Sequence, residues 1–256
     1  EWFLSAIKGY NSCLFLNSLL KSMKPLNIAL KRLIFVVAMI ILNGCSSSHN
    51  NHWSYEGIES PDHWADLNKE FETCQKGDHQ SPIDIHNKDA LPSAQELMFA
   101  YLPTHTHIIN NGHSIEFDMD EDNFIAVDNK RYKLKQLHFH ADSEHKINGN
   151  QFPAEMHLVH EAADGQLAVI ALLIEIGETP VYDHIFDKIP KIGEEIKVDL
   201  HLESFIPKNK ARYSYNGSLT TPPCSENVLW LIFEQHLFVP LKQLQKFKAY
   251  YSHNYR

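Results

Sequence analysis

The alternation of apolar and polar residues predicts that most of this chain folds as β-strands. Runs rich in β-branched and aromatic residues are separated by turn signals, among them Asn110-Asn111-Gly112, Asn148-Gly149-Asn150 and Asp164-Gly165. The predicted strands are residues 114–117, 124–127, 132–140, 154–160, 167–176 and 228–234. Their short connections favour antiparallel pairing, with successive hairpin turns at Asn148-Gly149 and Asp164-Gly165.

Helical periodicity is limited to three short segments, residues 64–71, about 181–188, and 241–250. No composition break or linker divides residues 53–256. We therefore predict one mainly β (α+β) domain over 53–256, with short helices at its surface.

The N-terminal part has a different pattern. Lys24, Lys31 and Arg32 precede an unbroken apolar run at 33–42, which ends in Asn-Gly-Cys45. Ten apolar residues match the core of a signal peptide and are too short to span a bilayer, although a buried helix is the alternative. The ending resembles a bacterial lipoprotein signal with Cys45 as the lipidated residue. Cleavage without lipidation stays open, because Asn is less usual at that position.

Residues 23–45 alone make a complete signal, so Met23 is a plausible start and residues 1–22 an upstream segment outside the mature protein. Residues 46–52 are then a polar linker. This arrangement predicts a bacterial periplasmic protein, as an outer-membrane lipoprotein or, alternatively, as a soluble periplasmic or secreted protein.

Composition describes an ordinary globular protein of 256 residues, with 43% hydrophobic and 21% charged residues. Residues 1–45 hold 5 of the 23 Lys and Arg and 1 of the 32 Asp and Glu, so the remainder has a formal charge of −13. Such a charge repels nucleic acid and excludes it as a partner. The expected partners are small molecules.

Cysteine usage follows from export. Cys13 and Cys45 fall in the N-terminal segments, which leaves Cys74 and Cys224 in the domain. An even pair in an oxidising compartment is disulfide-bonded by default. Two separate buried thiols are the alternative.

Histidine is unusually frequent, and five of the 17 histidines lie within residues 136–160. On the predicted strand 132–140, His138 and His140 are two residues apart and therefore face the same side. Phe139 between them faces the opposite side. Two imidazoles on one face are the beginning of a metal site.

His157 completes the set on the next predicted strand, 154–160. Antiparallel pairing of the two strands through the Asn148-Gly149 turn places His157 opposite His138 and His140. Three converging imidazoles leave one position of a tetrahedral ion open, which is typical of a catalytic zinc site. An incidental surface cluster of histidines is the alternative.

Gln136 and Glu155 each lie two residues before a predicted ligand, on the same face. They are placed to accept the second ring N–H of that ligand, as metal-bound histidines require. His145 and His160 lie outside the converging set. We interpret His160 as a packed or hydrogen-bonded residue of the opposite face and His145 as structural, beside Glu144.

Five segments together resemble the α-class carbonic anhydrases, specifically their bacterial branch. These are QSPIDI (80–85), NNGHSIEF (110–117), HFHADSEH (138–145), AEMHLVH (154–160) and SLTTPPCSE (218–226), in order within a resemblance from Trp53 to Arg256. The resemblance implies a central, twisted, mostly antiparallel sheet of about ten strands. It also matches the paired cysteines of that branch.

The resemblance also implies site residues. His138, His140 and His157 match the zinc ligands, with Gln136 and Glu155 behind them. Further matches are Thr220 and Glu144 for orienting the nucleophile, His113 for proton transfer, Tyr55 and Asn111 for ordering water, and Val159, Val169, Leu219, Thr221 and Trp230 for the substrate pocket.

The implied function is zinc-dependent, reversible hydration of CO₂ to bicarbonate and a proton, by attack of zinc-bound hydroxide, in a monomer or homodimer. A non-catalytic carbonic-anhydrase-like binding module and a periplasmic zinc-binding protein are the alternatives. Glu116 departs from the family pattern, which more often has a neutral amide there. The chain also stops at HNYR, where the pattern continues, so we expect further C-terminal residues.

Overall fold

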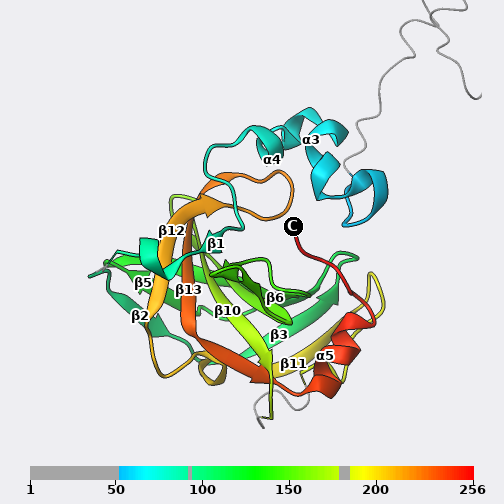
Figure 1. Cartoon of the computed structure of the whole chain (residues 1–256). Helices are drawn as coiled ribbons and strands as arrows, with labels where there is room; N and C mark the ends of the chain where they lie inside the picture. Colours follow the sequence, from blue (N-terminus) through cyan, green and yellow to red (C-terminus); the bar gives the residue numbers. More distant parts are fainter. Residues whose placement is uncertain (1–51, 92–93, 179–184) are drawn as a thin grey trace, which may run out of the picture. The chain divides into compact units, whose positions relative to one another are not determined.

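A ten-stranded sheet is the main element of the computed structural model, which describes residues 52–91, 94–178 and 185–256 (Figure 1). The path across it runs through β11 (Glu195–His201), β3 (Pro103–Asn110), β4 (Ile115–Met119), β6 (Lys130–His140), β9 (Ala154–Ala162), β10 (Leu167–Ile176), β13 (Glu226–Val239) and β12 (Arg212–Ser218). In addition, β5 (Phe124–Val127) pairs with β6, and β2 (Leu97–Ala100) pairs with β5. Only the β10–β13 pair is parallel among these strands. The predicted fold class is confirmed.

All six predicted strands are present, and β5 and β10 have the predicted bounds. The sequence missed four strands of this sheet, β2, β3, β11 and β12. In β3 the buried positions include Thr104 and Thr106, so apolar alternation is weak there. β12, with the sequence RYSYNGS, is polar along most of its length.

A smaller three-stranded sheet lies beside the main one, formed by β1 (Asp84–Ile85), β7 (Lys146–Ile147) and β8 (Asn150–Gln151). Asn148 and Gly149 have φ of 50° and 81°, as a two-residue hairpin turn requires. This turn closes β7 on β8, so the prediction that it joins the two histidine strands directly is wrong. β7 and β8 are an excursion between β6 and β9, which still pair with each other.

The helices are short. They are η1 (Gly57–Glu59), η2 (Pro61–His63), α3 (Trp64–Leu67), η3 (Lys69–Phe71), α4 (Thr73–Lys76), η4 (Asn87–Asp89), η6 (Leu202–Phe205) and α5 (Leu241–Lys248). The helix predicted at 64–71 is interrupted at Asn68, which has extended backbone and accepts a hydrogen bond from the Glu70 N–H. The helix predicted near 181–188 falls partly outside the described residues, and residues 185–188 are turn and coil. No helix within the described ranges is long and apolar enough to cross a membrane.

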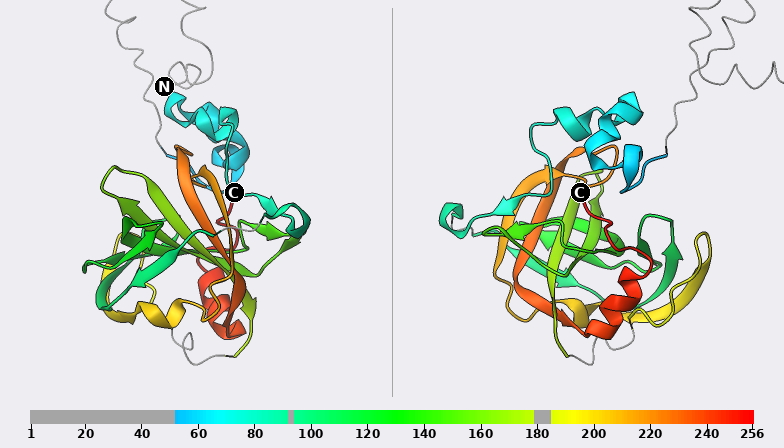
Figure 2. Two further views of the ribbon diagram at one scale, coloured as in Figure 1. Left: turned by 90° about the vertical axis from the view of Figure 1, so that its left-hand side faces the viewer. Right: turned by 45° about the vertical axis from the view of Figure 1, so that its right-hand side comes forward.

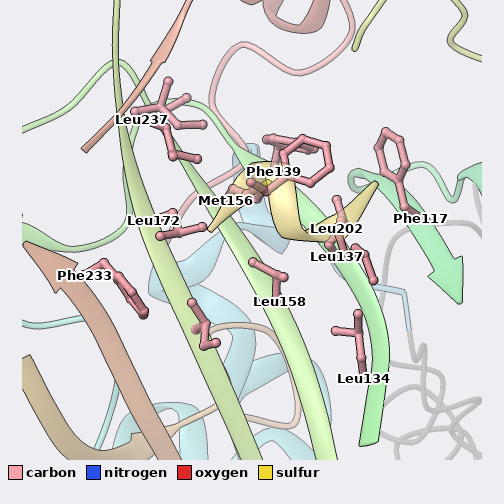
Figure 3. Packing of buried hydrophobic residues seen from close by; sticks show 14 of the residues in the cluster. Phe117, Leu134, Leu137, Phe139, Met156, Leu158, Leu172, Leu202, Phe233 and Leu237 are labelled. Carbon is pink, nitrogen blue, oxygen red and sulfur yellow. The ribbon is translucent and has the colours of Figure 1, made fainter. Parts of the chain in front are cut away.

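The two faces of the sheet bury different side chains. The larger apolar cluster includes Leu137 and Phe139 of β6, Met156 and Leu158 of β9, and Leu172 of β10 (Figure 3). Leu244 and Phe247 place α5 against this cluster as well. The opposite face carries a smaller apolar cluster and the histidines of the predicted site.

A register shift between Leu134 and Gln136 lets β6 place its leucines on one face of the sheet and its histidines on the other. Leu134 and Leu137 are three residues apart, so regular alternation would place them on opposite faces. The shift against β9 allows both to enter the larger cluster. Beyond it, Gln136, His138 and His140 all face the other side.

The residues before β1 form a third, small cluster. Trp64, Phe71 and the disulfide-bonded Cys74 and Cys224 are buried together in it. The C-terminal residues after α5 run back across the sheet toward this segment (Figures 1 and 2). Both segments therefore reach the face that carries the histidines.

Candidate metal centre and active site

His138, His140 and His157 converge from two paired strands. His138 is directly opposite His157 in the β6–β9 register, and His140 is one alternate position further along β6. The Nε2 atoms of His138 and His140 are 3.0 Å apart, and the three ligand nitrogens lie within 4.8 Å of one another. His140 and His157 are buried. The predicted trio is therefore assembled as the strand pattern requires.

Each of these rings has an acceptor at its other nitrogen. Nδ1 of His138 is 2.8 Å from Gln136 Oε1, and Nε2 of His157 is 2.8 Å from Glu155 Oε1. Nδ1 of His140 is 2.5 Å from the carbonyl oxygen of Asn254. These acceptors assign the ring protons to the outer nitrogens.

The inner nitrogens carry no proton, so their lone pairs face one another. Burial lowers the pKa of all three rings, for His140 to about 4, so they are neutral at pH 7. Three neutral imidazole lone pairs directed at one point fit a zinc ion.

Behind His157, a hydrogen-bonded chain leads away from the site. Glu155 Oε1 is 2.6 Å from His145 Nδ1, and His145 Nε2 is 2.7 Å from the Tyr215 hydroxyl. The chain ends at Ser81 Oγ, 2.8 Å from Tyr215. Burial acts to raise the pKa of Glu155, but the opposing effect of His145 and His157 is larger. The pKa is therefore well below its ordinary value, and this carboxylate stays ionised. His145 is therefore structural through Glu155, not through Glu144.

Glu144 lies on the other side of His157. Its Oε1 accepts the backbone N–H of Arg256 at 3.0 Å, and its Oε2 is 4.0 Å from His157 Nδ1. Burial raises the pKa of Glu144 to about 7, and the nearby Thr220 hydroxyl acts in the opposite direction. Among the described residues, Oε2 accepts no hydrogen bond of normal geometry. The Thr220 hydroxyl is the neighbouring donor that can use this acceptor.

Thr220 is held by a tight loop after β12. The Leu219 N–H donates to the Ser225 carbonyl and the Cys224 N–H to the Thr221 carbonyl, both at 2.9 Å. The predicted disulfide between Cys74 and Cys224 is present, with the Cα atoms 5.0 Å apart. It ties this loop to the N-terminal segment.

An apolar wall adjoins the histidines. Val159, Val169, Leu219 and Trp230 all belong to the smaller apolar cluster. The Trp230 ring centroid is 4.9 Å from that of His157, and Trp230 Nε1 donates to the Ser218 carbonyl. Thr221 is half-buried in the same loop as Thr220.

His113 lies in the bend just before β4 and is half-buried. Its ring stacks on Trp53, with centroids 3.9 Å apart and planes at 15°. Tyr55 contacts the same Trp53 edge-on. Asn111 Oδ1 accepts the backbone N–H of His113 at 2.9 Å, which fixes the turn. The structure thus brings His113, Tyr55 and Asn111 together around Trp53 and the turn before β4.

Glu116 is opposite His138 in the β4–β6 register, so it does face the site. Its pKa is raised to about 7, first by burial and then by Asp118, while the Asn111 amide at 3.2 Å acts against this. The departure from the family pattern therefore adds a titrating group at neutral pH.

Sequence reasoning missed Asn254, Arg256 and Tyr215. Asn254 contributes through a backbone carbonyl, for which no side-chain signal exists. Tyr215 alternates with Tyr213 on β12, a strand that was not predicted.

Comparison with known proteins agrees with the geometry. Residues 59–256 match the family model described as eukaryotic-type carbonic anhydrase. A protein named carbonic anhydrase from Pectobacterium atrosepticum is 36% identical over 222 residues, covering 84% of this chain and 90% of the relative. The structure of an α-carbonic anhydrase from Thermovibrio ammonificans, in complex with the inhibitor sulfanilamide, has a TM-score of 0.75 and 38% identity, covering 78% of this chain and 90% of that one. The Photobacterium profundum α-carbonic anhydrase has a TM-score of 0.74 and 35% identity, covering 80% and 94%.

Proposed function

This chain belongs to the α-class, or eukaryotic-type, carbonic anhydrases, which interconvert CO₂ and bicarbonate, and on that premise we propose that His138, His140 and His157 hold a catalytic zinc ion. The observation that carries the proposal is the set of three inward lone pairs, each fixed by an acceptor at the other ring nitrogen. When bound by three imidazoles, zinc lowers the pKa of a water molecule to about 7, the value known for carbonic anhydrases, and so supplies a nucleophile at neutral pH.

Thr220 and Glu144 orient that nucleophile. If the Thr220 hydroxyl donates its only proton to Glu144, its oxygen can only accept a hydrogen bond from the nucleophile. The nucleophile would then be held with its remaining lone pair directed at the substrate carbon. Val159, Val169, Leu219 and Trp230 offer a nonpolar surface suited to CO₂, and Thr221 adds a polar group at its border.

His113 carries the proton away. Each turnover releases one proton, and a group that titrates near neutral pH can accept it and return it to solvent. Tyr55 and Asn111 flank the path and are suited to ordering water along it. His113 is half-buried, and the hydrogen bond from Asn254 to its backbone carbonyl holds the turn that carries it near His140.

We further propose export as a bacterial periplasmic protein. The support is the apolar run at 33–42 with its basic flank and Cys45, residues outside the described structure. Lipid attachment at Cys45 is part of this proposal, as is a monomeric or homodimeric state. The disulfide supports an oxidising compartment.

A non-catalytic binding module is not favoured. Such a role needs neither all three histidines nor the pairing of Thr220 with Glu144. A zinc scavenger would likewise have no need of Thr220 and Glu144. The whole site supports CO₂ hydration, the activity of the carbonic anhydrase family.

The test measures zinc content and CO₂ hydration of the full chain by metal analysis and stopped-flow kinetics. We expect one zinc per chain, loss of both signals with a chelator, and recovery on adding zinc. His140→Ala should remove both, whereas His105→Ala, an exposed histidine of β3, should change neither. A metal-free His140→Ala protein with normal activity would disprove the proposal.

A further inference from the structure

A second histidine stands beside His113 at the surface. The ring centroids of His52 and His113 are 6.2 Å apart. Trp53, the residue after His52, stacks on the His113 ring. A separation of this size is one that a single water molecule can bridge. Two imidazoles are therefore within one water of each other at the outer end of the proposed proton path.

His52 is paired with a carboxylate. Its Nδ1 is 3.1 Å from Glu59 Oε2, an ion pair when His52 is protonated. Trp64 Nε1 donates to the carbonyls of both Ser54 and Glu59, which closes the turn that brings His52 and Glu59 together. The turn thus holds the backbone of this segment so that the two side chains lie within reach of each other.

The exposure of the two rings differs. His113 is half-buried under Trp53, which limits the approach of buffer molecules. The side chain of His52 is 62% exposed. Burial and the nearby charge of His52 both lower the pKa of His113, so protons on the two rings affect each other.

We propose that His52 is a second proton-relay residue, which takes the proton from His113 through water and hands it to buffer, with Glu59 stabilising its protonated form. The inference rests on the proposed role of His113. One proton passes from a ring nitrogen of His113 to water, and one from that water to a ring nitrogen of His52. His113 returns to its neutral form, a buffer base then takes the proton from His52, and no electrons are transferred.

The experiment compares His52→Gln, His52→Ala and Glu59→Gln in the zinc-loaded full chain. Gln retains a hydrogen-bond donor toward Glu59 but cannot carry a proton. His63→Ala is the matched control, because it removes another exposed histidine from the same segment. Turnover is measured in dilute and in concentrated imidazole buffer, and isotope exchange between CO₂ and bicarbonate at equilibrium reports the step at the metal.

In dilute buffer we expect both His52 variants to lose roughly 3- to 10-fold in kcat, less than the 10²-fold or more that a primary acid–base group contributes. Imidazole should restore the loss, kcat/KM and the exchange rate should be unchanged, and Glu59→Gln should lie in between. His63→Ala should match the wild type.

Wild-type turnover of His52→Gln in dilute buffer, with His113→Ala slow, would overturn this inference and leave the proposed function intact. A fall in kcat/KM as large as the fall in kcat would also overturn it, because the role of His52 would then be structural. Wild-type turnover of His113→Ala would remove the premise, and absence of hydration by the zinc-loaded wild type would refute the proposed function itself.

Discussion

His140 and Asn254 are 114 residues apart in the sequence, yet the imidazole N–H of His140 is hydrogen-bonded to the Asn254 carbonyl at 2.5 Å. The Asn254 side chain strengthens the link. Its Oδ1 accepts the Ala141 N–H at 2.9 Å, and its Nδ2 donates to the carbonyls of Phe139 and His113. One asparagine thus holds the end of β6, the orientation of a metal ligand and the turn of the proposed proton carrier.

Asn254→Ala should therefore weaken both folding and zinc binding. The buried Ala141 N–H loses its acceptor, which costs about 1–3 kcal/mol of unfolding free energy. The backbone carbonyl that accepts from His140 remains but is held less firmly, so zinc affinity should fall by up to about 10-fold, the lower end of the effect of losing an outer hydrogen-bond partner. Denaturant unfolding of the zinc-free protein and competition with a chelator measure the two effects. Asn209→Ala, which removes an exposed and local hydrogen bond, is the control and should change neither. Equal behaviour of the two variants would contradict the role of Asn254.

The trio of histidines was predictable because the period of two along a strand places His138 and His140 on one face, and antiparallel pairing of neighbouring strands brings His157 opposite them even though β7 and β8 intervene. Asn254 was not, because all of its contacts depend on a return of the chain across 114 residues, and the one to His140 is made by a backbone carbonyl. The register shift in β6 left a trace in the sequence, since the consecutive polar residues Lys135 and Gln136 interrupt the alternation between Leu134 and Leu137. β11 could have been found, as Ile196, Val198 and Leu200 alternate with polar residues.

Tyr215→Phe tests the chain of hydrogen bonds behind His157. Loss of the hydroxyl leaves His145 Nε2 without its partner and frees His145 to move against Glu155. We expect faster zinc dissociation, with affinity lower by up to about 10-fold. Tyr213→Phe removes the hydroxyl that donates to Asn87 at the surface, and it should behave as the wild type. Identical zinc dissociation in both variants would show that the chain does not support the metal.

His160 should make the zinc-free protein sensitive to acid. Its ring is fully buried, with Nε2 2.7 Å from the Tyr101 hydroxyl and Nδ1 3.2 Å from the Ala168 carbonyl, so the neutral form is satisfied. Burial lowers the pKa of His160 to about 3, against about 6.5 in the unfolded chain. Its contribution to stability is full above pH 6.5 and is lost as pH falls toward 3. Between pH 7 and 4.5 the loss amounts to about 2–3 kcal/mol.

The measurement is the urea unfolding free energy of zinc-free protein at pH 7 and pH 4.5. His160→Gln should be less stable at pH 7 but should lose about 2–3 kcal/mol less than the wild type on acidification. His105→Gln changes an exposed ring and serves as the control. If His160→Gln and the wild type lose the same amount, another group is responsible for the acid sensitivity.

Thr220 offers the sharpest test of how the site works, because it is proposed to orient the nucleophile and not to bind the metal. The hydroxyl lies near the Glu144 carboxyl, in a loop fixed by two backbone hydrogen bonds and the disulfide. Thr220→Ala removes the hydroxyl while the loop and the metal ligands keep their own contacts. Zinc content should therefore stay at the wild-type level. The kcat/KM for CO₂ should fall by about 10²-fold, the usual effect of losing one preorganised polar contact to the reacting group.

Thr220→Ser keeps the hydroxyl and should recover most of the activity. Equal activity of the Ala and Ser variants would exclude orientation by the hydroxyl, and loss of zinc from Thr220→Ala would make its role structural.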